Sequence, residues 1–354
     1  MDSRERVRLA LTCRKPDRIP RALGFFPQSL PQIAPISPED YFGLDIRYVE
    51  FDSPPEQEGF LAYLEGLPRD LHLGSLAQLQ TYYEWGYHPE RGEAHPLGQA
   101  ASPEETLRFA LPDLADPRRH AHLRDQVARW HEGGLAVAAA PPHLGGELLE
   151  TAWRLRGFEA FLTDLLVRKP LAHYLLVQLT DLVVESTLIL VQAGVDILLL
   201  DDDVAMPTGL LISPGLWREF FKPRLARIIH LAREVNPDLL VFYHSDGNFT
   251  RLVPDLVEIG MNAINPLQPD CMDAVAIKRE FGGRLALWGT VGTAALWDRG
   301  TPDQVREEVR LRVETLGPEG LLLAPAYDLD FAPWENIVAF VAAAEEFGRA
   351  ACAS

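Results

Sequence analysis

The sequence predicts an α/β protein built as a single (β/α)8 barrel of the TIM type, with an N-terminal helical and irregular extension. Short apolar runs alternate with longer helical patterns along the chain, as in parallel α/β folds. The short runs are apolar at nearly every position, which is typical of strands buried on both faces. A length of 354 residues suits one such barrel. An open doubly wound sheet is the alternative, but no Gly-x-Gly-x-x-Gly turn supports a nucleotide site in it.

We expect one domain over residues 1–354, with an extension at 1–44 and the barrel at 45–354. Residues 2–13 carry a helical apolar stripe that ends before Pro16. Six prolines follow from Pro16 to Pro38, which predicts an irregular segment wrapped over a surface. No stretch has the composition of a linker that would divide the chain.

Eight strands are expected, each from a short and largely apolar run. They lie at 45–51, 80–85, 135–140, 196–200, 239–243, 262–264, 285–288 and 321–323. Helices are expected from patterns of helical period between these runs. They lie at 157–169, 171–193, 214–235, 250–259, 273–281, 302–316 and 334–349. Ser213 before Pro214 and Thr301 before Pro302 predict capped helix starts.

In such a barrel the active site lies at the carboxyl ends of the strands, so polar residues directly after each apolar run are the candidates. Asp52 follows the first run, where it either reaches the site or starts a turn. Asp201, Asp202 and Asp203 follow the run 196–200. Their repulsion is relieved by a metal, an arginine or a raised pKa. We expect at least one of them, Asp202 or Asp203, to face the site.

Residues 241–248 read VFYHSDGN and place a histidine and an aspartate at the end of a buried run. His244 and Asp246 are two apart, so they share one face if the strand persists. This pair suits acid/base chemistry or two ligands of a divalent metal, zinc or a harder ion. The alternative is a turn at Asp246-Gly247 and a hydrogen-bonded core histidine.

Other residues after predicted strands are candidates for binding a substrate. His143 stands in a loop with two glycines that let a backbone approach a ligand. Asn265 and Gln268 can donate hydrogen bonds, and Tyr327 can act as a donor or weak acid. Cys271 is either a soft metal ligand or, as we favour, an inert thiol, because nothing electropositive adjoins it in sequence.

The composition narrows the class of protein. A net charge of −18 without a basic run disfavours nucleic acid and anionic lipid as partners. The start of the chain lacks a signal-peptide core, and apolar runs are interrupted by charge, so neither export nor a membrane span is expected. An odd count of three cysteines indicates a reducing compartment, and we expect a cytoplasmic protein.

Four segments resemble the uroporphyrinogen decarboxylase superfamily, which includes porphyrinogen decarboxylases and cobalamin-linked or coenzyme-linked methyltransferases. They are SRERVRLALTCRKPDRIP, DDDVAMPTGLLISPGLWREFFKPRLARII, VFYHSDGNFTRLVPDLVEIGMNAINPLQPDCMD and GTPDQVREEVRLRVETLGPEGLLLAPAYDLDFAPWENIVAFV. Together they extend over nearly the whole chain. The resemblance implies a distorted (β/α)8 barrel and, by analogy with the decarboxylases, a homodimer.

The chain departs from the signatures of both branches. The decarboxylases carry an Arg-Gln-Ala-Gly-Arg segment for substrate carboxylates, where this chain has 22–28 without arginine, although Arg18 and Arg21 are near. Asp52 is the nearest match to their catalytic aspartate, and Tyr327 replaces their late histidine. The methyltransferases carry His-x-Cys and a late cysteine that hold zinc; here Asp246 takes the place of the first cysteine and the second is missing.

The leading hypothesis is an enzyme of a divergent branch, a lyase or methyltransferase, acting on a small carboxylated or methoxylated compound by acid/base or metal-assisted chemistry. His244 and Asp246 would be the base or metal ligands, and Asp52 or Asp202 would stabilise positive charge. One alternative is authentic uroporphyrinogen decarboxylation without a cofactor, with Arg18 and Arg21 binding substrate. The others are methyl transfer or demethylation with a corrinoid protein, and a non-catalytic binding barrel.

Overall fold

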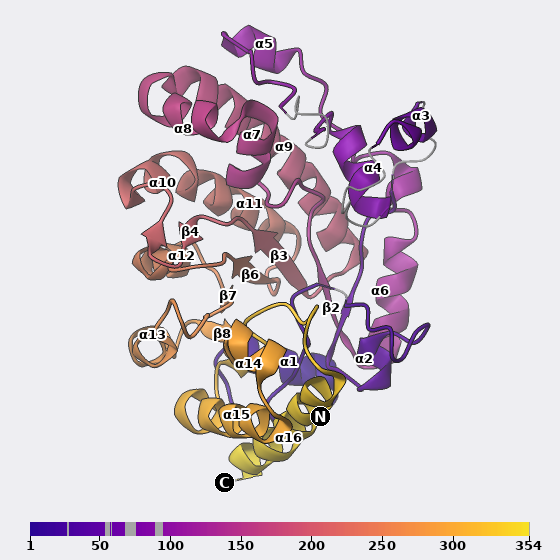
Figure 1. The fold of residues 1–354 in the computed structure, drawn as a ribbon, viewed down its shortest axis with the longest axis vertical. Coiled ribbons are helices and arrows are strands. Elements are labelled where there is room, and N and C mark those ends of the chain that lie inside the picture. Colours follow the sequence, from indigo (N-terminus) through magenta and orange to yellow (C-terminus); the bar gives the residue numbers. More distant parts are fainter. Residues whose placement is uncertain (27, 54–56, 58, 68–75, 89–94, 354) are drawn as a thin grey trace.

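The computed structural model describes residues 1–26, 28–53, 57, 59–67, 76–88 and 95–353. Its main sheet has seven parallel strands in the order in which they occur in the chain. They are β1 (Ile46–Tyr48), β2 (Ala136–Ala139), β3 (Ile197–Asp201), β6 (Leu240–His244), β7 (Ala263–Asn265), β8 (Ala286–Trp288) and β9 (Leu321–Leu322). The sheet curls and helices cover it from outside (Figure 1). The predicted α/β class and TIM-type architecture are confirmed.

The prediction of a strand at 80–85 is wrong, because all but the last residue of this segment lie in helix α4 (Leu76–Glu84). Its tyrosines favour a strand by propensity, but Leu79 and Tyr83 are four residues apart and pack on one side, against Phe60 and Tyr63. A helix alone brings residues four apart onto one face. Packing therefore outweighs the local preference for a strand.

The N-terminal extension lies between the two edge strands of the sheet. The Ala22 N–H donates to the Leu323 carbonyl at 2.9 Å, and the Leu323 N–H donates to the Pro20 carbonyl at 2.9 Å. On the other side, the Asp45 N–H donates to the Arg21 carbonyl at 3.4 Å. A short extended piece of the proline-rich wrap thus takes the eighth place in the ring.

The helices pack around the sheet, and several begin as the sequence predicts. Ser213 accepts a hydrogen bond from the Leu216 N–H, and Thr301 forms a capping box with Gln304. The helix predicted at 214–235 is divided before Pro223, which lacks the N–H needed to continue a helix. The helices are α1 (Ser3–Leu11), α2 (Pro38–Tyr41), α3 (Phe60–Glu65), α4, α5 (Pro103–Leu107), α6 (Leu123–Glu132), α7 (Leu149–Arg156), α8 (Phe158–Val167), α9 (Lys169–Ala193), α10 (Pro214–Phe220), α11 (Lys222–Val235), α12 (Val253–Glu258), α13 (Ala274–Phe281), α14 (Ala294–Arg299), α15 (Pro302–Leu316) and α16 (Trp334–Ala353).

Helix α9 is the one described helix that is long and apolar enough to cross a membrane by length and composition. Asp181 and Glu185 interrupt its apolar run, as expected, but two charges are too few to exclude the helix by composition. However, 61% of its apolar stretch is buried inside the protein, where it packs against α5, α8 and α11. A core helix of a globular protein has the same composition.

The strands alternate between two apolar clusters, which fixes the direction of every side chain on them. Leu240 and Phe242 of β6 lie in the cluster inside the barrel, and so do Ile197 and Leu199 of β3. The residues between them, such as Val241 and Leu198, lie in the cluster beneath the helices. A side chain two positions after Phe242 or Leu199 therefore points into the mouth of the barrel.

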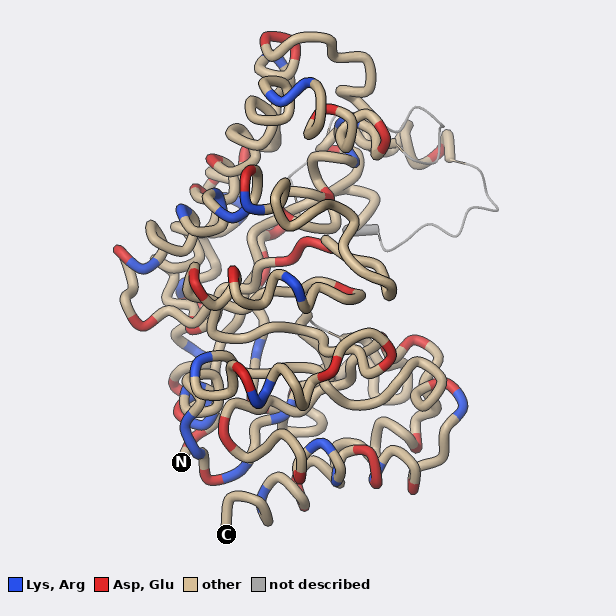
Figure 2. The backbone as a smooth tube through the Cα atoms, turned by 90° about the vertical axis from the view of Figure 1, so that its left-hand side faces the viewer, with Lys and Arg blue, Asp and Glu red and all other residues tan. Residues whose placement is uncertain are grey.

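Charged residues are spread over the outer helices. Figure 2 shows blue and red segments mixed along these helices. This arrangement agrees with the absence of a basic run in the sequence.

Candidate functional site

Asp201 and His244 are the last residues of β3 and β6, and they are direct partners across the parallel pair. Both continue the inward face of their strands, two positions after Leu199 and Phe242. The His244 Nε2 lies 4.0 Å from the Asp201 Oδ1. The fold thus places a histidine and a carboxylate side by side at the carboxyl ends of adjacent strands.

Asp203 completes a group of three, which we call the triad: Asp201, Asp203 and His244. The Asp203 Oδ1 lies 3.9 Å from the His244 Nε2. It also accepts a hydrogen bond from the Asp246 N–H at 2.6 Å, which fixes its position. One possible ligand atom from each member lies within 4.8 Å of the other two.

The tautomer of His244 follows from its neighbours. The Asn265 Nδ2 donates to the Trp288 carbonyl at 3.0 Å, so the Asn265 Oδ1 is the atom that faces His244. That oxygen lies 2.6 Å from the His244 Nδ1, and because it only accepts, Nδ1 carries the proton. The Nε2 lone pair is then directed toward the two carboxylates.

The triad fits a divalent cation. An imidazole nitrogen whose other nitrogen donates to a fixed oxygen, together with two carboxylates, suits zinc or a harder ion such as manganese. The pairing of His244 with Asp246 as ligands stays a prediction. The Asp246 carboxylate accepts from the Gln268 Nε2 at 2.8 Å, and Asp201, which our site prediction omitted, stands at the triad instead. Side chains two residues apart on a strand point the same way, so Asp201 shares the direction of Leu199. This alternation is the sequence signal that could have identified Asp201.

Asp202 points away from the triad and anchors helix α7. Its carboxylate accepts hydrogen bonds from the N–H groups of Leu148, Leu149 and Glu150 at 3.2, 2.8 and 2.9 Å. Burial raises the pKa of Asp202 to about 7, although these donors favour the ionised form. Asp202 therefore satisfies the open N-terminal end of a helix.

Glu147 joins the carboxylates behind the triad. It accepts a hydrogen bond from the Asp201 N–H, and its own N–H donates to the Asp201 carbonyl at 2.8 Å. Burial, followed by the charge of Asp202, raises the pKa of Glu147 well above its usual range. Burial, followed by the charges of Glu147 and Asp203, does the same for Asp201. A bound cation would relieve this crowding of negative charge.

The remaining predicted polar residues line one side of the barrel mouth. Gln268 holds the Asp246 carboxylate and accepts from the Gly247 N–H at 2.9 Å. The Tyr327 hydroxyl donates to Asp270 at 3.2 Å, and burial followed by the Asp270 charge raises the pKa of Tyr327. Cys271 lies beside Gln268, where burial raises the pKa of its thiol. These groups are neutral or negative.

His143 is half-buried near the triad, and it lines the same cavity as Asp201. Burial, followed by the positive charges of Arg154 and His244, lowers the pKa of His143 to about 4. Its Nδ1 is buried and has no hydrogen-bond partner within the described chain. A buried ring nitrogen in this state is available to a ligand.

Two cavities meet at Phe25 and Phe26 above the strand ends. The polar cavity, about 200 Å³, is lined by His244, Asp246, Asn265, Gln268, Tyr327 and Asp328 among others. The apolar cavity, about 320 Å³, is lined by Tyr48, Val49, Glu50, Ala138, Ala139, Ala140, His143, Leu199 and Asp201 with the two phenylalanines. Phe25 stacks on the His244 ring with centroids 4.1 Å apart. The triad thus spans the boundary between the two cavities.

Besides Asp202 and Asp203, three further predicted site residues line neither cavity: Arg18, Arg21 and Asp52. Arg18 binds Asp45 with both terminal nitrogens, at 2.8 and 2.9 Å, and Arg21 pairs with Glu345 of α16. The side chain of Asp52 is 63% exposed and lies 3.2 Å from the His122 Nδ1. The arginines expected to bind substrate are occupied by ion pairs that join the extension to the barrel.

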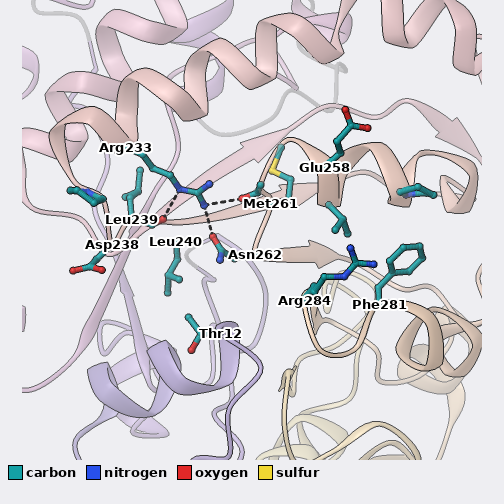
Figure 3. A pocket seen from close by; sticks show the side chains of 14 residues that line it. Thr12, Arg233, Asp238, Leu239, Leu240, Glu258, Met261, Asn262, Phe281 and Arg284 are labelled. Carbon is teal, nitrogen blue, oxygen red and sulfur yellow. Dashed lines mark hydrogen bonds between the residues drawn. The ribbon is translucent and has the colours of Figure 1, made fainter.

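A wider cavity, about 750 Å³, lies at the opposite end of the barrel, where β6 and β7 begin (Figure 3). Arg233 projects from α11 into it and donates to the carbonyls of Leu239 and Gly260 and to the Asn262 side chain. These bonds tie a helix to the starts of two strands. The cavity is far in the fold from the carboxyl ends where barrels carry chemistry.

Comparison with known proteins gives one family. The family model described as "Uroporphyrinogen decarboxylase (URO-D)" matches residues 136–347. A "Methylcobamide:CoM methyltransferase MtaA" of Methanosarcina barkeri is 28% identical over 162 residues, 45% of this chain and 44% of the relative. A "Uroporphyrinogen decarboxylase" of Xanthomonas euvesicatoria is 34% identical over 248 residues, 65% of this chain and 63% of the relative.

The matched region thus spans less than half the length of the Methanosarcina barkeri relative. Among solved structures, a "methyltransferase from Methanosarcina mazei" superimposes with a TM-score of 0.70 at 19% identity. The superposition covers 98% of this chain and 99% of the Methanosarcina mazei chain. At this identity the likeness shows the fold alone.

Proposed function

The chain belongs to the uroporphyrinogen decarboxylase family, and from this premise we propose that it is a metal-dependent methyltransferase of small molecules. The triad carries the proposal. Asp201, Asp203 and His244 converge at the carboxyl ends of β3 and β6, and Asn265 directs the His244 Nε2 lone pair toward the carboxylates. This is the arrangement of ligand and supporting residue that metal sites use.

The charges around the triad argue against a substrate with many carboxylates. The described linings of the two cavities contain Glu50, Asp201, Asp246 and Asp328 and no lysine or arginine. Binding a polyanion there would bring like charges together in a partly desolvated space, and no lysine or arginine of the described linings would neutralise them. Since Arg18 and Arg21 are held by Asp45 and Glu345, they do not supply the missing positive charge.

The residues of the chain have separate tasks in this proposal. A cation at the triad would act as a Lewis acid that activates a bound hydroxyl or thiol for methyl transfer. Asn265 keeps the proton on the His244 Nδ1, Phe25 shields the His244 ring from water, and Gln268 holds the Asp246 carboxylate. Asp203 is fixed by the Asp246 N–H. The ligand atoms are thus oriented before any cation arrives.

The methyl donor or acceptor proposed as a partner is a corrinoid. This rests on the name of the Methanosarcina barkeri relative, a methylcobamide methyltransferase. The thiol ligands that the resemblance implied for that branch are absent, and oxygen ligands replace them. We therefore propose a harder metal site in a corrinoid-linked enzyme, with a substrate that differs from those of the known branches.

Metal binding by the purified chain tests the proposal. Titration calorimetry with Zn²⁺ and Mn²⁺ should give one site, and absorption spectra with Co²⁺ should report its ligands. Asp201→Asn and His244→Gln should each weaken binding at least about tenfold, whereas His230→Gln, on the exposed face of α11, should not. Unchanged binding in both triad variants would refute the proposed site.

Porphyrinogen decarboxylation is the second candidate, favoured by the 34% identity to the Xanthomonas euvesicatoria relative. Anaerobic incubation of the protein with the octacarboxylate porphyrinogen decides between the two. We expect the substrate to remain unchanged, because the described linings of the cavities offer its carboxylates no lysine or arginine. Appearance of products with fewer carboxylates would establish the second candidate instead.

A further inference from the structure

We propose that the apolar cavity binds a methylated ammonium or sulfonium cation that carries a hydrogen-bonding group. The inference deepens the proposed function and rests on it, since it names the substrate class of the cavity next to the triad. Three independent features of the cavity support it: the aromatic walls, the sign of the charges in the lining, and the buried nitrogen of His143.

Aromatic rings form much of the wall. Phe25, Phe26 and Tyr48 all line the cavity. Phe25 and Phe26 meet edge to face at 4.9 Å, and the Tyr48 hydroxyl donates to the Gly24 carbonyl at 2.8 Å, which ties the wrap to β1. Aromatic rings attract methylated cations through their π faces, and clusters of them recognise quaternary ammonium groups.

The charges in the lining are negative. Glu50 and Asp201 border the apolar cavity, and Asp246 and Asp328 border the adjoining polar one. A divalent ion at the triad would balance Asp201 and Asp203 and leave the other carboxylates uncompensated. The field at the cavity therefore stays negative with the metal bound, which favours a cation over an uncharged ether of the same shape.

The unpaired Nδ1 of His143 is the reason for proposing a hydrogen-bonding group on the ligand. His143 lines the same cavity, and its buried Nδ1 has no hydrogen-bond partner within the described chain. Leaving a buried nitrogen unpaired costs free energy, and a hydroxyl on the bound molecule would satisfy it. The aliphatic residues Val49, Ala139 and Leu199 complete a surface suited to methyl groups.

Choline and its uncharged carbon isostere, 3,3-dimethylbutan-1-ol, test the inference because they differ only in charge. Both are titrated by calorimetry into the full chain, with and without the metal found to bind. We expect choline to bind about tenfold more tightly than the alcohol, as cation–π and charge attraction require. Equal affinities, or no choline binding at millimolar concentration, would overturn the inference.

Two variants test separately the contribution of the negative charge and that of the aromatic ring to choline binding. Glu50→Gln removes a charge and keeps the shape, and Phe26→Leu removes a ring that is 41% exposed in the free protein. Each should weaken choline severalfold and leave the alcohol unchanged. Glu132→Gln, at the exposed end of α6, is the matched control. Choline affinity that is the same in Glu50→Gln as in the unaltered protein would contradict the assignment.

The outcomes for the triad and for this cavity are distinguishable. Choline binding without any metal site would refute the proposed function and keep the cavity. A metal site without a preference for choline would do the reverse. Each proposal thus has a binding measurement of its own, and neither depends on turnover.

Discussion

His244 depends on a single amide for its state at the triad. Asn265 accepts from the His244 Nδ1 at 2.6 Å and is itself oriented by the Trp288 carbonyl at 3.0 Å. Residues in this supporting position fix the tautomer and orientation of a ligand histidine, and their loss typically costs 10- to 100-fold in metal affinity, by rough estimate. Asn265 acts through His244, so it is a positioning residue.

Asn265→Leu should therefore lower the affinity for Zn²⁺ by about 10- to 100-fold. Asn265→Asp keeps an acceptor for the Nδ1 proton and should restore most of it. Titration calorimetry measures both, and the Co²⁺ absorption spectrum should change in the leucine variant alone. If the two variants lose affinity equally, Asn265 contributes packing and not orientation.

Asp202 lies between two residues of the triad in sequence, but its hydrogen bonds show that it stabilises the start of helix α7. Asp202→Ala would leave the N–H groups of Leu148, Leu149 and Glu150 without their acceptor. Urea denaturation should show a loss of about 1–3 kcal/mol in the free energy of unfolding. The affinity for metal should fall less than in Asp201→Asn. Equal stability of the alanine variant would contradict this role.

The difference between Asp201 and Asp202 shows what the sequence could predict of the site. The end of β3, and His244 and Asp203 as separate candidates, followed from apolar runs and from the position of barrel sites, but the pair predicted there was His244 and Asp246 and not the triad. Which of three adjacent aspartates turns inward depends on the phase of the strand, and Leu199 in the inner cluster sets it. The partners of Arg18 and Arg21 lie 27 and 324 residues away, beyond the reach of any local pattern.

At the scale of elements, the extension is held to the barrel by a buried ion cluster. Asp45, just before β1, accepts from Arg6, from Arg18 and from the Arg21 N–H. Burial acts to raise the pKa of Asp45, but the hydrogen bonds from Arg18 and Ser3 and the positive charge of Arg18 outweigh it, so the pKa is lowered. The ionised form of Asp45 thus stabilises the position of the extension between β9 and β1.

Asp45→Asn should lower the free energy of unfolding by roughly 3–5 kcal/mol, because buried arginines lose their partner. A lowered pKa means that the unaltered chain keeps this stability above pH about 4, the pKa range of an unfolded aspartate, and loses it as pH falls through the lower folded value. Urea midpoints between pH 3 and 6 should show this slope, reduced in the variant. Asp303→Asn, exposed on α15, should leave the slope unchanged.

The elements also show where sequence patterns fail. Parallel strands of the ring were recognised because they are buried on both faces, a strong signal over few residues. The run at 80–85 is rich in aromatic residues, which favour strands, yet most of it lies in α4 beside Phe60 and Tyr63. The piece of the wrap around Arg21 pairs with β9 without any strand-like run. Its place depends on contacts that form only when the barrel closes.

At the scale of the whole molecule, an acidic chain concentrates carboxylates at one end of its barrel. Asp201, Asp203 and Glu147 lie together in a largely buried space, where like charges destabilise the folded state. A site held ready for a cation in this way lowers the stability of the empty protein. Evolution commonly accepts such a loss at functional sites.

Asp203→Asn separates the charge repulsion in the empty protein from the stabilisation by a bound cation. Without metal it should melt at a higher temperature than the unaltered chain, because one repelling charge is gone. With metal at a hundred times its Kd, the unaltered chain should gain about 2.7 kcal/mol from binding, and the variant, which binds weakly, should gain far less, so the order of melting temperatures reverses. Calorimetric scans in chelator and in Zn²⁺ measure this, with Asp303→Asn as control. A variant that is less stable in both conditions would show that Asp203 supports the fold through its bond to the Asp246 N–H and not a cation.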